Sequence, residues 1–477
     1  MRKLSVVLSG ILLVALAGSA LAGSQPKFVY IAGSNHIIGN TIDPTTGAIG
    51  AQMVNDSSFQ PSAIARDPSG KFVYMVNSDE DTIAGYAVDP DTGALTMVPG
   101  SPLPAGKPWP DNGDPLPLWW VYVDPLSRFV YALGYGNGLN DGTSCISVYK
   151  MDPDTGELTP VAGSPFTTAI NPISLTVDPS GKFAYVATHD GLITGYRING
   201  STGALTPVAG SPFNNKAGQV GFHDMTISPS GKFLYTTRFT PDSSVLVFAI
   251  NQTTGALTAA SGSPFKVGTG AASIALHPSG QFAYLSDAQD LVVRTLAVNS
   301  TTGALTVKSS ASVGVPPPDD YPTFVTLDQS GSFAYTVNYG YSVSGFAINQ
   351  STGALTAVPG SPFNSSAELL QMVIIDSAPA HCTPNFTVAP LPNTQSGNFN
   401  TTSEVCFDVV STKPLYFNCS QMSQRTVTVN GTPYQSSACN SSLGKSVKLD
   451  AAPDGNYYFD VSAGSPSWAS IAFWNGN

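Results

Sequence analysis

Apolar and polar residues alternate with a period of two along most of the chain, and the 3.6-residue repeat of an amphipathic helix is absent. The alternating runs are short, and residues typical of turns separate them, mainly Pro, Gly, Asp and Ser. Residues 182–186, for example, read Lys-Phe-Ala-Tyr-Val and follow directly on Asp-Pro-Ser-Gly. The pattern predicts an all-β protein built from many short strands joined by tight turns.

A single unit of this pattern recurs from residue 27 to residue 376. It consists of an apolar strand ending in Asp-Pro-Ser-Gly, a Lys-Phe-x-Tyr strand, a third strand, an Asp-Pro-x-Thr-Gly turn and a final strand. The turn glycines are separated by between 46 and 63 residues and number seven: Gly47, Gly93, Gly156, Gly203, Gly255, Gly303 and Gly353. Four strands at this period predict a seven-bladed β-propeller.

The two ends of the repeat region predict how the ring closes. Residues 27–31 already match the second strand of later units, so the first unit lacks its opening strand. One additional apolar run, residues 369–376, follows the seventh unit. We expect this run to supply the missing innermost strand as a latch, which removes both open edges of the ring.

The chain outside the repeats predicts three further segments. Residues 1–22 have the basic start, short apolar core and small-residue end of a signal peptide. The propeller is expected over 23–377, a linker over 378–402, and a small β-sandwich over 403–477. Four cysteines in the tail are expected to form two disulfides, with three pairings open: Cys382, Cys406, Cys419 and Cys439. Cys145 is expected to be a buried thiol.

Charge excludes two classes of function. Loss of Arg2 and Lys3 with the signal peptide changes the formal net charge from −11 to −13, which disfavours contact with nucleic acid or an anionic membrane. No later run is long enough for membrane insertion, so we expect a secreted or periplasmic protein. Neither a cofactor nor a metal is expected, because the histidines are scattered and the Asp-Pro-Asp-Thr-Gly turns lack the ligand ladder of calcium loops.

The repeats at residues 178–186 and 335–338 resemble the seven-bladed β-propeller lactonase family, which includes bacterial 6-phosphogluconolactonase. The resemblance covers residues 27–376 and implies lactone opening by His, Arg and Glu side chains at one mouth of the channel. Where the family has His-x-His, this chain has Gly221-Phe222-His223, so only the second histidine is kept. Arg238 stands where the family has an acid. The Arg-His and Glu positions of the next blade hold other residues: Ala272, Ser273 and Ala288.

Strand ends at one face of the ring carry the candidate site residues. Second strands are expected to end there in five polar residues: Asn77, Thr188, Arg238, Asp287 and Asn338. His223 and Asp224 begin a first strand at the same face. We interpret His223, Arg238 and Asp287 as candidate catalytic residues, with His223 as general base and Arg238 as partner of a developing oxyanion, and the others as ligand contacts. The alternative, which the pattern favours, is a polar plug between blades.

The longest insertion, residues 99–118, is expected to cover the same mouth. It contains Trp109 and leads into Trp119, which places aromatic faces beside acids as in many sugar-binding surfaces. The alternative is a Pro-rich lid in which the tryptophans only pack.

Three functions remain open from the sequence. The first is a secreted binding module for a small molecule, a carbohydrate or a protein partner, which the loss of the family's catalytic positions favours. The second is a lactone hydrolase with a rebuilt active site around His223. The third is a structural surface protein.

Overall fold

The computed structural model describes most of the repeat region and, from residue 377 onward, only strands. The described residues are 25–33, 36–56, 58–105, 118–134, 144–169, 171–214, 222–239, 242–314, 321–365, 368–376 and the tail strands given below. The predicted signal peptide and Trp109 lie outside them. Among these residues no helix is long and apolar enough to cross a membrane.

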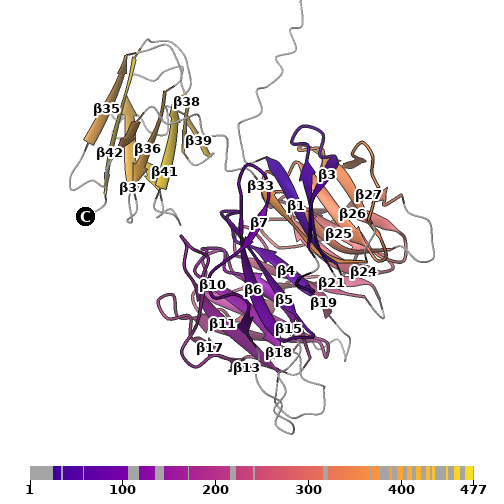
Figure 1. Ribbon diagram of the computed structural model, residues 1–477. Coiled ribbons are helices and arrows are strands. Elements are labelled where there is room, and N and C mark those ends of the chain that lie inside the picture. Colours follow the sequence, from indigo (N-terminus) through magenta and orange to yellow (C-terminus); the bar gives the residue numbers. More distant parts are fainter. Residues whose placement is uncertain are drawn as a thin grey trace, which may run out of the picture.

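Seven antiparallel sheets make up the described part of the chain before residue 377, which confirms the seven-bladed β-propeller (Figure 1). The innermost strands are β4 (Ala63–Arg66), β9 (Leu118–Val123), β14 (Pro172–Val177), β19 (Phe222–Ile227), β24 (Ala271–Leu276), β28 (Pro322–Leu327) and β33 (Leu369–Asp376). The second strands are β1 (Pro26–Gly33), β5 (Phe72–Asn77), β10 (Phe129–Gly134), β15 (Phe183–Thr188), β20 (Phe233–Arg238), β25 (Phe282–Asp287) and β29 (Phe333–Asn338).

The outer half of each blade is formed by a third and a fourth strand. The third strands are β2 (His36–Ile42), β6 (Thr82–Val88), β11 (Cys145–Met151), β16 (Leu192–Ile198), β21 (Ser244–Ile250), β26 (Val292–Val298) and β30 (Ser342–Ile348). The fourth are β3 (Ile49–Asp56), β7 (Leu95–Met97), β12 (Leu158–Pro160), β17 (Leu205–Pro207), β22 (Leu257–Ala259), β27 (Leu305–Ser312) and β31 (Leu355–Ala357). Short strands β8 (Leu103–Pro104), β13 (Phe166–Thr167), β18 (Phe213–Asn214), β23 (Phe265–Lys266) and β32 (Phe363–Asn364) pair with the third strand of their blade.

The latch predicted from the sequence is strand β33. It pairs antiparallel with β1, with Val29 opposite Ile374 and Ile31 opposite Met372, so the first and last segments of the repeat region share one blade (Figure 1). Ile374 and Met372 are each 1% exposed and pack in a core cluster with residues of β29 and β30. Apolar burial therefore joins the latch to the seventh blade as well as to the first.

In five blades the tyrosine of the repeat donates a hydrogen bond to the Thr-Gly turn of another blade. All seven tyrosines of this position are at most 1% exposed: Tyr30, Tyr74, Tyr131, Tyr185, Tyr235, Tyr284 and Tyr335. At the closing seam, the Tyr335 hydroxyl donates a hydrogen bond of 2.7 Å to the Gly47 carbonyl of the first Thr-Gly turn. Gly47 has a φ of +73°, and a Cβ at this position would lie 2.3 Å from the Phe333 ring, so the turn requires glycine.

The aspartates of the repeat act as predicted for turns. Asp178 Oδ1 accepts hydrogen bonds from the backbone N–H of Lys182 (2.7 Å) and Phe183 (2.6 Å). Asp89 Oδ1 likewise accepts from Thr92 in its own hairpin, as a hairpin turn requires. Cys145 is fully buried in β11, which confirms the prediction of a buried side chain.

The tail contributes two further sheets, in the orders β34-β36-β41-β38-β39 and β35-β42-β37-β40. Their strands are β34 (Phe386–Val388), β35 (Gln395–Asn400), β36 (Val405–Val410), β37 (Leu415–Ser420), β38 (Thr426–Val429), β39 (Thr432–Gln435), β40 (Val447–Leu449), β41 (Asn456–Val461) and β42 (Trp468–Asn475). Strands β34 and β35 fall within the predicted linker 378–402 and pair with β36 and β42, so the tail sheets begin earlier than predicted. The predicted disulfides concern side chains outside the described ones.

Candidate functional site

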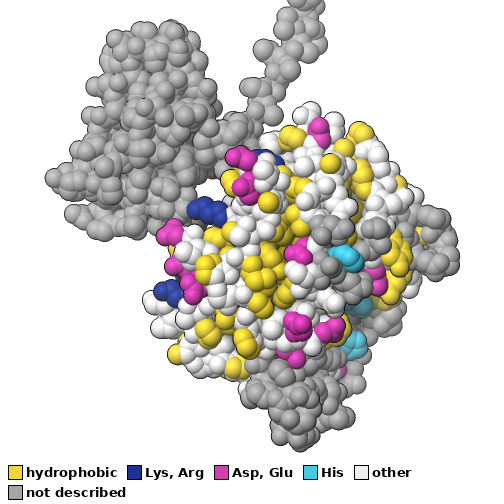
Figure 2. Space-filling view, viewed as in Figure 1, with side chains coloured by type: hydrophobic (Ala, Val, Ile, Leu, Met, Phe, Trp, Pro, Cys, Tyr) yellow, Lys and Arg dark blue, Asp and Glu magenta, His cyan; other side chains and the backbone are white. Residues whose placement is uncertain are grey.

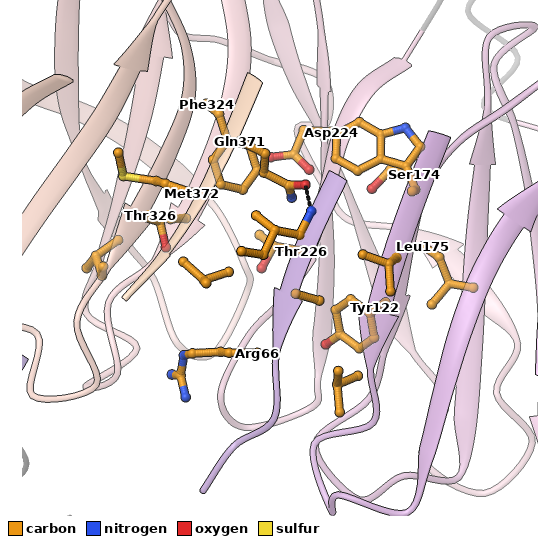
Figure 3. A pocket seen from close by; sticks show the side chains of 18 of the residues that line it. Arg66, Tyr122, Ser174, Leu175, Asp224, Thr226, Phe324, Thr326, Gln371 and Met372 are labelled. Atoms are coloured by element: carbon orange, nitrogen blue, oxygen red, sulfur yellow. Dashed lines mark hydrogen bonds between the residues drawn. The ribbon is translucent and has the colours of Figure 1, made fainter. Parts of the chain in front are cut away.

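The centre of the ring is hollow. A cavity of about 610 Å³ is lined by all seven innermost strands. Its walls carry aromatic side chains, namely Trp120, Tyr122 and Phe324, and small hydroxyl side chains, namely Ser174, Thr226 and Thr326. Figure 3 shows five of them, Tyr122, Ser174, Thr226, Phe324 and Thr326, coming from several strands toward one space. Among the described lining residues, one has a guanidinium group, Arg66, and two have carboxyl groups, Asp224 and Asp328.

At one level of the channel, three side chains hydrogen-bond the backbone of the neighbouring innermost strand, and each stands four residues before the end turn of its own strand. Gln371 Oε1 accepts from Ile64 N (3.0 Å), as Figure 3 shows, and Asp224 Oδ2 accepts from Ile274 N (3.1 Å). In each pair a side-chain oxygen of one blade accepts a hydrogen bond from a backbone N–H of the next blade. The same position in β24, Ser273, accepts from Val325 N at 3.2 Å. We call Gln371, Asp224 and Ser273 the inner belt.

Asp224 is the carboxylate of the inner belt. Its Oδ2 also accepts from the Ser273 hydroxyl (2.7 Å), and its Oδ1 accepts from Met225 N (2.7 Å). Burial raises the pKa of Asp224, while hydrogen bonds from Ser273, Ile274, Met225 and Ser174 act in the opposite direction. Asp224 thus makes polar contacts between two blades, as the polar-plug alternative predicts, and it also lines the cavity.

His223 precedes Asp224 in β19 and is exposed. Its ring lies 5.2 Å from the ring of Phe239, between centroids. Partial burial, followed by the nearby charge of His189, lowers the pKa of His223. This shift favours the neutral imidazole, which can accept a proton.

Arg238 and Asp287 end their second strands as predicted, but each is engaged within its own blade. Arg238 is 3% exposed, forms an ion pair with Asp242, and donates from Nε to Asp242 Oδ1 at 2.8 Å. Asp287 is fully buried and accepts from Arg294 Nε at 2.8 Å. Burial alone would raise the pKa of Asp287, but hydrogen bonds from Thr269, Arg294 and Asp290 outweigh it and lower the pKa. Within the described part of the chain, no hydrogen bond or ion pair joins His223, Arg238 and Asp287.

The predicted ligand contacts at the second-strand ends are buried in hairpins. Asn77 Oδ1 accepts from Asp79 N at 2.8 Å, Thr188 Oγ1 accepts from Leu192 N at 3.2 Å, and Asn338 Nδ2 donates to Ser342 Oγ at 2.9 Å. These bonds orient the turn to the third strand of the blade. Trp119 is 50% exposed at the start of β9, as a surface contact requires.

The cavity lies toward the opposite end of the channel from the mouth where the sequence predicted the site. His223 and the second-strand ends lie where the innermost strands begin, whereas the cavity runs from the inner belt to the turns where these strands end. Figure 3 shows Asp224 and Gln371 at one end of the view and Arg66 at the other. Of the predicted site residues, Asp224 lines the cavity. Aligning the units on Asp-Pro-Ser-Gly finds the other lining positions, because each has a fixed offset from this turn.

No metal cluster of three or more His, Cys, Asp or Glu side chains occurs among the described residues. On the face seen in Figure 2, Asp and Glu side chains are spread over the described surface, whereas Lys and Arg lie near one edge.

Comparisons with known proteins agree on one family and fold. The family model described as "Lactonase, 7-bladed beta-propeller" matches residues 17–109 and 117–365. A putative 6-phosphogluconolactonase from Bacteroides uniformis superposes with a TM-score of 0.59 at 19% identity, covering 74% of this chain and 100% of its own. A periplasmic gluconolactonase from Pseudomonas aeruginosa gives 0.58 at 17% identity, covering 73% and 99%. At these identities the likeness concerns the fold. No curated protein matches the sequence significantly.

Proposed function

Because the chain belongs to the seven-bladed β-propeller lactonase family, we propose that it binds a small saccharide or sugar lactone in its central channel. Family membership alone does not establish the activity, since propellers carry many functions. The observation that carries the proposal is the cavity of about 610 Å³, a volume typical of small-ligand sites.

The side chains of the cavity suit a ligand with hydroxyl groups. Tyr122 and Phe324 offer apolar faces on which a sugar ring can stack, and Ser174, Thr226 and Thr326 offer hydroxyls. Asp224 adds an acceptor at the inner belt. A phosphorylated lactone is disfavoured, because Arg66 is the single basic residue among the described residues of the lining and phosphate recognition generally uses several donors.

We place this binding outside the cytoplasm. The sequence of residues 1–22 has the features of a signal peptide, and one structurally similar protein is described as periplasmic. Within this proposal the tail is an accessory domain held by its four cysteines, and Trp119 contributes to an outer contact at the face where His223 lies.

Thr226→Phe tests the channel. Phenylalanine at this position is expected to narrow the cavity and weaken binding by about tenfold or more, since every 1.4 kcal/mol lost is about tenfold in affinity. The position tolerates an aromatic ring, because β9 carries Tyr122 at the equivalent place in the repeat. Isothermal titration calorimetry against a panel of neutral sugars and aldonolactones measures the effect. Thr258→Phe, on the exposed fourth strand β22, is the matched control. Equal affinity of both variants would contradict a channel site.

A second candidate function is lactone hydrolysis. The observation that favours it is the neutral, exposed imidazole of His223, which can act as general base toward water. If the protein is a hydrolase, acid release from aldonolactones and aromatic lactones rises above the buffer blank, and His223→Ala abolishes it. Arg238→Ala is the accompanying variant. Arg238 forms an ion pair with Asp242, so its loss can disturb the fold. The circular dichroism spectrum of the Arg238→Ala variant must therefore match that of the unaltered protein before a loss of rate is assigned to chemistry.

A further inference from the structure

We propose that Arg66 makes the channel selective for a saccharide that carries a carboxylate, such as a hexuronic acid. This inference rests on the proposed function, since it concerns a ligand of the same channel. It goes further in naming the charge of the ligand and the residue that recognises it.

Arg66 makes only long contacts with the described part of the chain. Its Nη1 makes two long hydrogen bonds, to the carbonyls of Asp67 (3.3 Å) and Pro68 (3.4 Å). The nearest carboxylate oxygen, Asp376 Oδ2, is 3.9 Å from Nη2, which exceeds hydrogen-bond length. By contrast, Arg128 binds both carboxylate oxygens of Asp124, at 3.2 and 2.6 Å. A guanidinium has five N–H donors, so Arg66 can still bind a carboxylate in the bidentate geometry.

The position of Arg66 in the repeat is otherwise aliphatic. It is the last residue before the end turn of its innermost strand. The equivalent residues of the other six blades are Val123, Val177, Ile227, Leu276, Leu327 and Ile374. An aliphatic residue therefore suffices for packing here, and the arginine adds a charge to the wall of the cavity. The side chain keeps 22% of its surface exposed.

Two carboxyl groups stand near Arg66, and neither hydrogen-bonds it. Asp376, at the end of the latch, accepts from Gln329 N at 3.1 Å with Oδ1, and its burial raises its pKa to about 6. Its buried Oδ2 has no hydrogen-bond partner among the described residues and forms only the long ion pair with Arg66. Asp328, directly after β28, accepts from its own turn at Phe333 N (2.6 Å). One arginine matches one carboxylate, whereas a phosphate dianion would meet too little positive charge.

The two polar levels of the channel are separated along the strand. Asp224 stands four residues before the end turn and Arg66 stands one residue before its own, so the levels differ by three residues. At a rise of about 3.3 Å per residue this is roughly 10 Å. A ligand can thus place hydroxyls at the inner belt and its carboxylate at Arg66, and one or two sugar rings are the fitting size.

The test compares matched sugars by isothermal titration calorimetry on the full chain. The probes are galactose, galacturonate and digalacturonate. Galacturonate is expected to bind about tenfold more tightly than galactose, because a charge-assisted bond adds to the neutral contacts. Arg66→Leu, which places the residue of β24 and β28 at this position, is expected to remove the difference between galacturonate and galactose. Arg66→Lys should retain part of it.

Two further variants separate recognition from general charge. Arg197→Leu removes one exposed positive charge elsewhere on the surface and is expected to leave the selectivity unchanged. Asp376→Asn removes the neighbouring carboxylate and should tighten galacturonate binding.

The outcomes separate this inference from the proposed function. If galactose binds and galacturonate binds no more tightly, or if the preference survives in Arg66→Leu, the role of Arg66 is overturned while the channel site stands. If none of the three probes binds, both fail. A preference for galacturonate that disappears in Arg66→Leu alone supports both.

Discussion

Ile374→Asp is expected to lower the free energy of unfolding by about 4 kcal/mol or to prevent folding, because it buries an unpaired charge in the latch. Ile374 is 1% exposed and packs between the first and seventh blades. Equilibrium urea unfolding followed by circular dichroism measures the change.

Leu370→Asp is the control for this variant. Leu370 belongs to the same strand, β33, but is 37% exposed, so an aspartate there remains in water and should cost less than about 1 kcal/mol. If the two substitutions destabilise the protein equally, burial of the latch does not account for closure. If neither does, the ring is stable without the seam between its last and first strands.

Asp287→Ala should produce the second large effect, a loss of about 3 kcal/mol of folding free energy. The substitution leaves partly buried donors of Thr269, Asp290 and Arg294 without their acceptor. Asp290→Ala is the matched control, since Asp290 pairs with the same arginine but its side chain is 40% exposed. We expect a loss of less than about 1 kcal/mol there.

The effect of Asp287 also depends on pH. Its pKa is lower in the folded protein than in the unfolded chain, so the folded state binds fewer protons at this group. The stabilisation is present above the unfolded pKa, near 4, and is lost as the pH falls through the folded value. Urea midpoints between pH 7 and pH 3 should therefore fall more steeply in the unaltered protein than in Asp287→Ala. Parallel curves would show that Asp287 stabilises the fold without its charge.

Prediction of the fold succeeded because the repeat encodes each blade locally. A turn that needs glycine at positive φ, as at Gly47, and a strand with a buried tyrosine, as at Tyr335, recur at a period that fits one blade. The unit count and the leftover strand 369–376 were then sufficient to predict the closed ring. The start of the tail sheets was missed because residues 386–400 have the Pro, Asn and Thr content of a linker, and only pairing with later strands identifies β34 and β35.

The repeat pattern alone predicts the strand on which each candidate residue lies and its place along that strand. Which side chains meet depends on how the strands and blades pack. Arg238 and Asp287 stand on adjacent blades, yet each pairs inside its own blade, with Asp242 and Arg294. The alternation of apolar and polar residues along a strand sets the position of a side chain. Its hydrogen-bond or ion-pair partner, however, depends on the third strand of the blade and on the neighbouring blade. The same holds for Arg66, whose place at the cavity becomes apparent only when seven innermost strands surround a common centre.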